Sequence, residues 1–295
     1  MKKKKQNMEN VSVKQNRLLA IWKQFRKNKG AMIGLIITLT IIFIAIFSDV
    51  IWDYEKDVIT MNVSERFIKP CLEHPFGTDE YGRDMLARVG YGAKYSLMIG
   101  ASAVLFGMII GIPIGASAGY VGGRYDAIIM RIIDAFGVIP SILLSITIVA
   151  AFGTSMLNLA IALSVGTIPI LARVTRAAVM TVRFNEYIES AQAIGASPLY
   201  IIFKHVLPNC FSSILVSCTL QMGAKIIGAS SLSYIGLGVA LPTPEWGALL
   251  SSAKGNILTA PYLCFFPGLA IMITVMAINL VGDGLRDALD PKMKR

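Results

Sequence analysis

The sequence predicts an all-α integral membrane protein with six transmembrane helices and both termini in the cytoplasm. Its composition, its long apolar runs and the distribution of its basic residues support this fold class. Hydrophobic residues make up 55% of the chain and charged residues 16%, and the mean hydropathy is +0.62. Soluble domains typically carry about 25% charged residues. The chain is therefore expected in the cell membrane as a multi-pass protein.

Six apolar runs are long enough to cross a hydrocarbon core, which requires about twenty residues in a helix. A backbone in lipid must satisfy its own hydrogen bonds, and runs of this length are too long for barrel strands, so helices are expected. The runs cover residues 31–51, 96–120, 127–152, 156–178, 211–241 and 262–281. Prolines 113, 140 and 169 fall inside these runs, where they either kink a span and widen a pathway or only shape packing. The long fifth run contains Gly223, Gly228, Gly236 and Gly238, which indicate a bend or an extracellular extension.

Basic residues predict the orientation, because Lys and Arg are retained on the cytoplasmic side. Of the 28 Lys and Arg residues, ten lie in residues 1–30. The loop after the first span holds only six of them. Most of the others lie in segments that face the cytoplasm if the N-terminus does. The formal charge of +10 then reflects topology and contact with anionic lipid headgroups. Nucleic acid is not an expected partner.

The N-terminal segment, residues 1–30, is basic, and residues 31–52 are expected to form an uncleaved first span. The segment is too long for a signal peptide, and the apolar run does not end in a small-residue cleavage pattern. Residues 14–29 alternate basic and apolar types at near-helical spacing, which favours a helix along the inner membrane surface. A solvated basic tail is the alternative. The apolar positions of this pattern are Leu18, Leu19, Trp22 and Phe25.

The extracytoplasmic loop, residues 53–95, is the largest stretch outside the predicted spans. Its glycines and its neighbouring charges suggest a tight turn that leads into an amphipathic helix before the second span. The charges either order the loop as ion pairs or contact a partner or solute directly. The candidate residues for such a contact are Asp79, Arg83 and Asp84.

Residues 184–208 form a polar insertion in the otherwise apolar five-helix core, which spans residues 96–283. Ser197 and Pro198 form an N-cap and first-turn pair, because the serine oxygen satisfies an orphan amide and proline has no amide to satisfy. Gly195 lies where the preceding helix needs a left-handed cap, and Pro208 is expected to end the following helix. A helix, a turn and a second short helix on the water side of the membrane are typical of a docking element for a soluble partner.

Small residues are concentrated in two spans, at residues 111–119 and 228–238. Such residues allow close helix packing, and their hydroxyl groups can also line a pathway for a polar solute. The pathway candidates are Ser230, Ser231 and Ser233. The glycine-rich turn at residues 119–126 does not match a phosphate-binding loop, since no G-x-x-x-x-G-K-[ST] motif occurs in the chain. No nucleotide cofactor is therefore expected in this chain.

Catalytic and metal sites are not predicted. His74 and His205 fall on opposite sides of the predicted membrane, and no cysteine pair has redox or metal-ligand spacing. A membrane enzyme would need a nucleophile beside a base, or paired carboxylates facing a cavity, and no acid and base share a span. A secondary transporter would need ionisable residues at mid-membrane depth, where the sequence offers only Lys225.

Four strings in the chain resemble the dipeptide, oligopeptide and nickel branch of ABC importer permeases, in its C-type subunit. The docking segment resembles the EAA loop, with Ser190 in place of the second alanine and His205 in place of an apolar residue. The other strings are HPFGTDEYGRD at residues 74–84, SYIGLGVALPTPEWGALLS at residues 233–251 and VGDGLRDALDPKMK at residues 281–294. Together they extend the resemblance over nearly the whole chain, including the cytoplasmic tail, residues 284–295.

The resemblance implies a type I ABC importer permease fold and a subunit without enzymatic activity. The implied partners are a second, different permease, one or two cytoplasmic ATPase subunits that bind ATP and Mg, and an extracytoplasmic solute-binding protein. The implied cargo is a dipeptide or oligopeptide, with nickel or a metal chelate as the alternative. The residues expected to couple the chain to the ATPase are Glu186, Glu189, Ala191, Gly195, Ser197, Pro198, Leu207 and Pro208.

Overall fold

A computed structural model describes residues 19–289, and this part of the chain is built from helices without a β-sheet. Four helices are long and apolar enough to cross a membrane alone. They are α2 (Lys29–Ile46), α4 (Met85–Val121), the continuous helix from Pro198 to Tyr234, and α13 (Tyr262–Leu289). Two broken pairs also qualify, so the described residues supply the six expected spans when each pair counts as one.

The broken spans bend where the sequence has proline. The helices α5 (Gly123–Val138) and α6 (Ser141–Phe152) meet at 79°, and Pro140 is the N-cap of α6. The helices α7 (Met156–Val165) and α8 (Ile168–Val182) meet at 47°, and Pro169 lies in the first turn of α8. Because proline lacks an amide hydrogen, it is tolerated at these helix starts. Pro113, in contrast, lies within the uninterrupted α4.

The helix α4 is the central element of the fold, and its closest neighbour is α8. Four glycines at four-residue spacing face α8, and a Cβ atom added at any of them would lie less than 3 Å from an α8 or Thr167 atom. Small residues at this spacing let two helix backbones approach closely. The packing role of the string at residues 111–119 is thereby supported. The glycines are Gly107, Gly111, Gly115 and Gly119.

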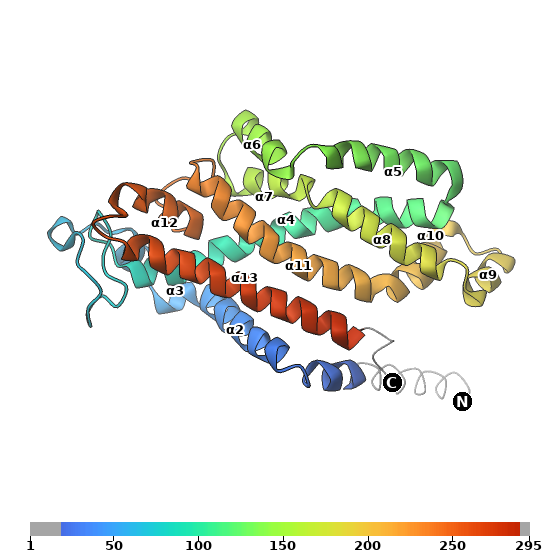
Figure 1. Cartoon of the computed structure of the whole chain (residues 1–295), viewed down its shortest axis with the longest axis horizontal. Coiled ribbons are helices and arrows are strands. Elements are labelled where there is room, and N and C mark those ends of the chain that lie inside the picture. Colours follow the sequence, from blue (N-terminus) through green and yellow to red (C-terminus); the bar gives the residue numbers. More distant parts are fainter. Residues whose placement is uncertain (1–18, 290–295) are drawn as a thin grey trace.

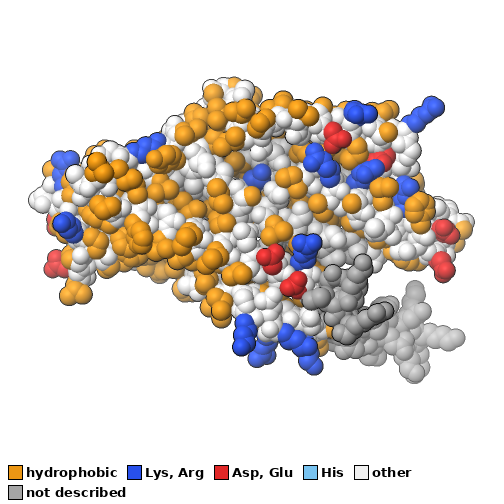
Figure 2. All heavy atoms as spheres, in the orientation of Figure 1, with side chains coloured by type: hydrophobic (Ala, Val, Ile, Leu, Met, Phe, Trp, Pro, Cys, Tyr) orange, Lys and Arg blue, Asp and Glu red, His pale blue; other side chains and the backbone are white. Residues whose placement is uncertain are grey.

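The long axis of the molecule separates two polar ends (Figure 1). One end carries the loop between α3 (Ser48–Ile51) and α4, together with α12 (Trp246–Ser252). The other carries α9 (Glu186–Ala193) and α10 (Pro198–Ile201). Hydrophobic side chains cover much of the face between them (Figure 2). This arrangement agrees with the topology predicted from the basic residues.

Residues 19–25 are helical and lie beside the cytoplasmic ends of α2 and α13. Leu19 and Trp22 are exposed, as expected for a helix on the membrane surface. Phe25 differs from that expectation: it is only 4% exposed and packs against Ala31 and Ala288. Packing against these residues removes the apolar surface of the ring from water. Leu18 and the tail residues 290–295 lie outside the described part of the chain.

Several predicted span boundaries differ from the structure; α13, for example, continues beyond residue 281 to Leu289. The helix expected to lead into the second span is continuous with it, so that α4 begins at Met85. The helix α11 (Leu207–Tyr234) is uninterrupted at Gly223 and Gly228 and ends before Gly236, whose φ is +89°. The remainder of the predicted fifth run is therefore an extension beyond the helix. Short elements complete the described chain: a π-helix at Tyr54–Ile59 and 3-10 turns at Val63–Glu65 and Ala253–Asn256.

Candidate functional site

The segment from α9 to the start of α11, residues 186–208, is the principal candidate site; we call it the coupling segment. Its first helix ends as the sequence predicts. Gly195 has a φ of +79°, its amide donates to Gln192 O (2.9 Å), and the Ala196 amide donates to Ala191 O (3.1 Å). These two bonds form a Schellman motif, which requires a left-handed residue at the position of Gly195.

The second helix also begins as predicted. Ser197 has extended backbone angles, its hydroxyl oxygen accepts from the Tyr200 amide (3.4 Å), and Pro198 follows at the first helical position. The N-cap thus satisfies one orphan amide, and proline removes another. The chain therefore reverses direction between Gly195 and Ser197 because of its local sequence, without help from a partner.

The prediction that Pro208 ends this helix is wrong. Residues Ile202–Val206 form a π-helical turn, the Leu207 amide donates to Ile202 O, and the helix continues directly into α11. Pro208 lies in the first turn of α11, where its missing amide hydrogen leaves no bond unmade. The wider π-helical turn accommodates the proline within the helix. As a result, α10 and the span α11 form one continuous 37-residue helix, Pro198–Tyr234.

One face of the coupling segment is buried against the membrane helices. Ile188 is 0% exposed, and it belongs to the same apolar cluster as Ala191 and Val206. This cluster also contains Leu171 and Val179 of α8. Burial of an aliphatic side chain of this size contributes about 1.5–3 kcal/mol. The segment is therefore firmly attached to the membrane helices.

The opposite face is exposed and mixes acidic with apolar side chains. Glu186 and Glu189 are exposed on α9, and acidic side chains are visible at that end of the molecule (Figure 2). Ile194 is 85% exposed, and Leu199 and Phe203 are also exposed. Exposed apolar side chains beside polar ones typically mark a protein interaction site. The EAA-like pattern does not include these apolar residues, which only the helix geometry places on the outer face.

Polar contacts tie the cytoplasmic ends of the helices together. Asp126 of α5 accepts two hydrogen bonds from Arg176 of α8, each 2.5 Å long. Arg183 donates to Gly119 O (2.9 Å), and Gln192 donates to the Tyr120 hydroxyl (3.0 Å). Bidentate pairs between a guanidinium and a carboxylate are strong and geometrically specific. Gln192 thus links the coupling segment directly to α4, and the Asp126–Arg176 pair joins α5 to α8.

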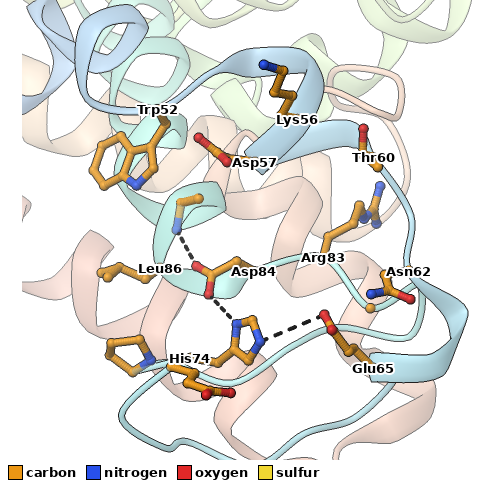
Figure 3. A pocket seen from close by; sticks show the side chains of 14 residues that line it. Trp52, Lys56, Asp57, Thr60, Asn62, Glu65, His74, Arg83, Asp84 and Leu86 are labelled. Atoms are coloured by element: carbon orange, nitrogen blue, oxygen red, sulfur yellow. Dashed lines mark hydrogen bonds and ion pairs between the residues drawn. The ribbon is translucent and has the colours of Figure 1, made fainter.

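Ion pairs order the outer loop, which is one of the two outcomes expected for it. Figure 3 shows the contacts of His74 with Asp84 and Glu65 in this loop. Arg83 Nε lies 2.7 Å from Asp79 Oδ2, and both residues are buried. Asp84 caps α4 by accepting from the Ala87 amide (2.8 Å), and it also lies 2.8 Å from His74 Nδ1. A cavity of about 540 Å³ lies beside this part of the outer loop. Arg83 and Asp84 are among its lining residues; Asp79 is not.

The serines proposed for the pathway lie near the outer end of α11. Ser230 and Ser233 are buried, and a Cβ atom added at Gly247 of α12 would contact both. Their hydroxyl groups have no hydrogen-bond partner among the described residues. Ser231 is less buried, and its hydroxyl donates to Ile227 O (2.8 Å). The structure therefore brings Ser230 and Ser233 together against α12 and separates them from Ser231.

Comparison with protein families explains this architecture. Residues 111–295 match the family described as "Binding-protein-dependent transport system inner membrane component". The chain belongs to this family of ABC importer permeases. Residues 18–70 of the permease also match the "N-terminal TM domain of oligopeptide transport permease C". The permease is accordingly a multi-pass membrane component without enzymatic activity of its own, as the resemblance implied.

Several curated relatives cover almost the whole permease. A dipeptide transport system permease protein, DppC, of Alkalihalophilus pseudofirmus is 45% identical over 92% of this chain and 89% of its own length. A glutathione transport system permease, GsiD, of Escherichia coli is 44% identical over 92% and 90%. A di/tripeptide transport system permease, DppC, of Pseudomonas aeruginosa is 42% identical over 94% and 93%.

Solved structures support the fold. A chain of the MetNI methionine ABC transporter, in an inward-facing crystal form, superposes with a TM-score of 0.58. The match covers 70% of the permease and 98% of that chain at 20% identity. The two chains therefore share a fold.

Proposed function

We propose that this chain forms one half of the membrane pathway of an ATP-driven importer for short peptides, and that an ATPase moves it through the coupling segment. A second, different permease supplies the other half of the pathway. One or two cytoplasmic ATPase subunits bind ATP and Mg, and an extracytoplasmic binding protein delivers the peptide. The curated relatives, whose printed names include dipeptide, di/tripeptide and glutathione permeases, support peptides as the cargo.

The observation that carries this proposal is the two-sided coupling segment. Its buried face, represented by Ile188 and Ala191, is packed onto the spans, while its opposite face presents Glu186, Glu189 and exposed apolar side chains. A soluble protein that grips the exposed face would therefore also displace the spans.

The backbone conformation of the segment is suited to a rigid lever. Gly195, Ser197 and Pro198 form a fixed elbow between α9 and α10, and Leu207 and Pro208 join α10 to the span α11 without a break. When ATPase subunits close on nucleotide, displacement of α10 is passed along the axis of α11. Such rigid-body motions switch a pathway between its inward and outward openings. The shift is limited by the difference in affinity of the ATPase for the two states.

We place the contact with the binding protein at the outer loop. In this proposal Asp84 lies at the rim of the cavity, while Asp79 and Arg83 hold the loop in shape. Ser231 remains the best exposed of the three serines proposed for the pathway, with Ser230 and Ser233 positioning α12 beside it. The chain itself binds no cofactor in this scheme.

Replacement of Gly195 tests the coupling role. A Cβ atom at Gly195 would meet no other atom of this chain within 4 Å, so a substitution there acts on the backbone and on the partner alone. Gly195→Val disfavours the left-handed backbone by about 1–2 kcal/mol. It is expected to preserve membrane insertion but to reduce co-purification of the ATPase and peptide uptake.

Gly195→Asn is the matched control, because asparagine adopts the left-handed conformation more readily. It is expected to retain most of the uptake. Equal ATPase binding and equal uptake by wild type and Gly195→Val would refute the coupling role. Failure of the wild-type complex to take up any labelled dipeptide, with uptake of nickel instead, would refute the assignment of the cargo.

A further inference from the structure

Lys225 lies on the membrane-spanning part of α11, where neither the fold nor the coupling segment requires a charge. It is 8% exposed, and no hydrogen bond or ion pair with residues 19–289 holds its ammonium group. It precedes the outer end of α11, Tyr234, by about nine residues, or roughly 14 Å of helix. This distance is about half of a hydrocarbon core of about 30 Å. Lys225 is therefore close to the membrane midplane.

The ammonium group of Lys225 points to the place where both broken spans bend. A Cβ atom added at Gly166, between α7 and α8, would lie 3.6 Å from Lys225 Nζ. The same point lies 3.3 Å from Ser141 Oγ, on the first residue of α6. The bends of the two broken spans and the lysine therefore meet at one location, and α6 and α7 lie next to each other there (Figure 1).

The beginning of α6 adds hydrogen-bond donors to this location. Its N-cap is Pro140, which makes no side-chain cap, and the amides of Ser141 and Ile142 donate to no group among the described residues. Ser141 is exposed. A helix N-terminus carries partial positive charge, and interrupted membrane helices commonly aim such termini at anionic groups of the substrate.

The two acidic residues of α5, the helix that precedes Ser141, are already paired with arginines of α8. Asp134 of α5 is paired with Arg173 (3.4 Å), and Asp126 is paired with Arg176 (2.5 Å). A lysine at the membrane midplane is costly unless it faces water, protein or an anion. The chain thus maintains a positive, donor-rich site at mid-depth.

We propose that Lys225, Ser141 and the N-terminus of α6 bind the terminal carboxylate of the peptide as it crosses the membrane. This inference rests on the proposed peptide cargo and extends it to a specific chemical group. A carboxylate fits because it accepts hydrogen bonds from the ammonium, the hydroxyl and the backbone amides at once. The peptide is thereby held at one end midway through the pathway.

The test measures binding of a labelled dipeptide to the purified, complete membrane complex without binding protein. The dipeptide is compared with its C-terminal amide, on wild type, Lys225→Met and Lys225→Arg. A hydrogen bond to a charged group is worth enough to predict that Lys225→Met weakens binding of the free acid at least tenfold. Binding of the amide is expected to change less than threefold, and Lys225→Arg is expected to retain most of the affinity for the acid.

Three outcomes would overturn the inference. Wild type could bind acid and amide equally well, or Lys225→Met could leave both affinities unchanged. Lys225→Met could also weaken both peptides equally with loss of the second permease on purification, which would assign Lys225 to an ion pair between subunits. Peptide uptake by the wild-type complex in cells is measured in parallel. If the wild-type complex takes up peptide but replacement of Lys225 does not affect acid and amide differently, only this inference is refuted. If the wild-type complex takes up no peptide at all, the proposed function is refuted.

Discussion

Asp126 and Arg176 form the most specific polar contact between the cytoplasmic halves of α5 and α8. Two hydrogen bonds of 2.5 Å join them, and Asp126 is 9% exposed. Since α5 and α6 form the span with the sharper bend, this pair fixes one arm of the bend to α8. Loss of either partner would leave the other charge partly buried without compensation.

A double-mutant cycle tests the energetic coupling of this pair. Asp126→Asn and Arg176→Met are each expected to lower the stability of the detergent-solubilised complex by about 1–3 kcal/mol. The double variant is expected to lose less than the sum of the two, because the second change removes the charge that the first left unpaired. Thermal unfolding of all four proteins measures the coupling. Strict additivity would show that the two side chains act independently.

Ser197 is a second residue whose role can be measured. Ser197→Ala removes the N-cap of α10 and is expected to destabilise that helix by about 1 kcal/mol. Ser197→Asp preserves a cap and is the matched control. Hydrogen exchange at the Tyr200 amide should accelerate in Ser197→Ala and remain slow in Ser197→Asp. Unchanged exchange in both variants would contradict the capping role.

Residues with local roles could be predicted from the sequence, and residues with long-range roles could not. Gly195 and Ser197 act on amides within five positions of themselves, so their pattern was sufficient to predict the turn. Lys225 could be placed at mid-depth from the sequence. The short distance from its ammonium group to Ser141 and Gly166 could not be predicted, because the breaks of the two broken spans lie side by side only in the folded chain. The burial of Arg88 likewise depends on a distant contact, since its guanidinium donates to Val58 O (2.9 Å).

At the scale of elements, the α4–α8 pair depends on the row of glycines in α4. A Cβ atom at Gly115 would lie 2.2 Å from Ala172 O, which is backbone and cannot move without separating the helices. The expectation of close helix packing at this string was therefore justified. The alternative of a pathway lining is not needed for residues that face α8.

Gly115→Ala is expected to reduce the stability or the yield of folded permease markedly. Even one methyl group there forces α4 and α8 apart. Gly268→Ala in α13 is the matched control, since a Cβ atom at that position meets no atom within 4 Å. The control is expected to be neutral or stabilising by up to about 1 kcal/mol, as alanine favours helix. Thermal unfolding in detergent compares them, and equal stability of the two variants would contradict the packing argument.

Pro208 shows why an element boundary could not be predicted from a single residue. Proline usually ends a helix, but here a π-helical turn at Ile202–Val206 places it in the first turn of α11. That turn is buried against α4 and α8 through Ile202 and Val206. Tertiary packing therefore outweighs the local preference, and α10 is continuous with the span α11. The proposed lever mechanism depends on this continuity.

At the scale of the whole molecule, the number of spans and the fold class followed from composition and from the length of the apolar runs. Their arrangement required the structure, because two of the spans are broken pairs with bends of 79° and 47°. The orientation rests on the distribution of Lys and Arg residues, and the structure places the coupling segment and the outer loop at opposite ends (Figure 1). The proposed mechanism depends on this separation, since an ATPase can act only from the cytoplasm.

Labelling with a membrane-impermeant maleimide tests the central claim most directly. Cys71 and Leu199 are both exposed, at opposite ends of the molecule, so one chain carries Cys71 alone and another carries Leu199→Cys alone, with the remaining cysteines replaced by serine. The cells used lack the ATPase subunits, which would otherwise cover Leu199→Cys. They also lack an intact outer membrane, which would otherwise keep the reagent from Cys71. The account predicts that Cys71 reacts in intact cells and that Leu199→Cys reacts only after the membrane is permeabilised. Labelling of Leu199→Cys in intact cells would place the coupling segment outside and contradict the account.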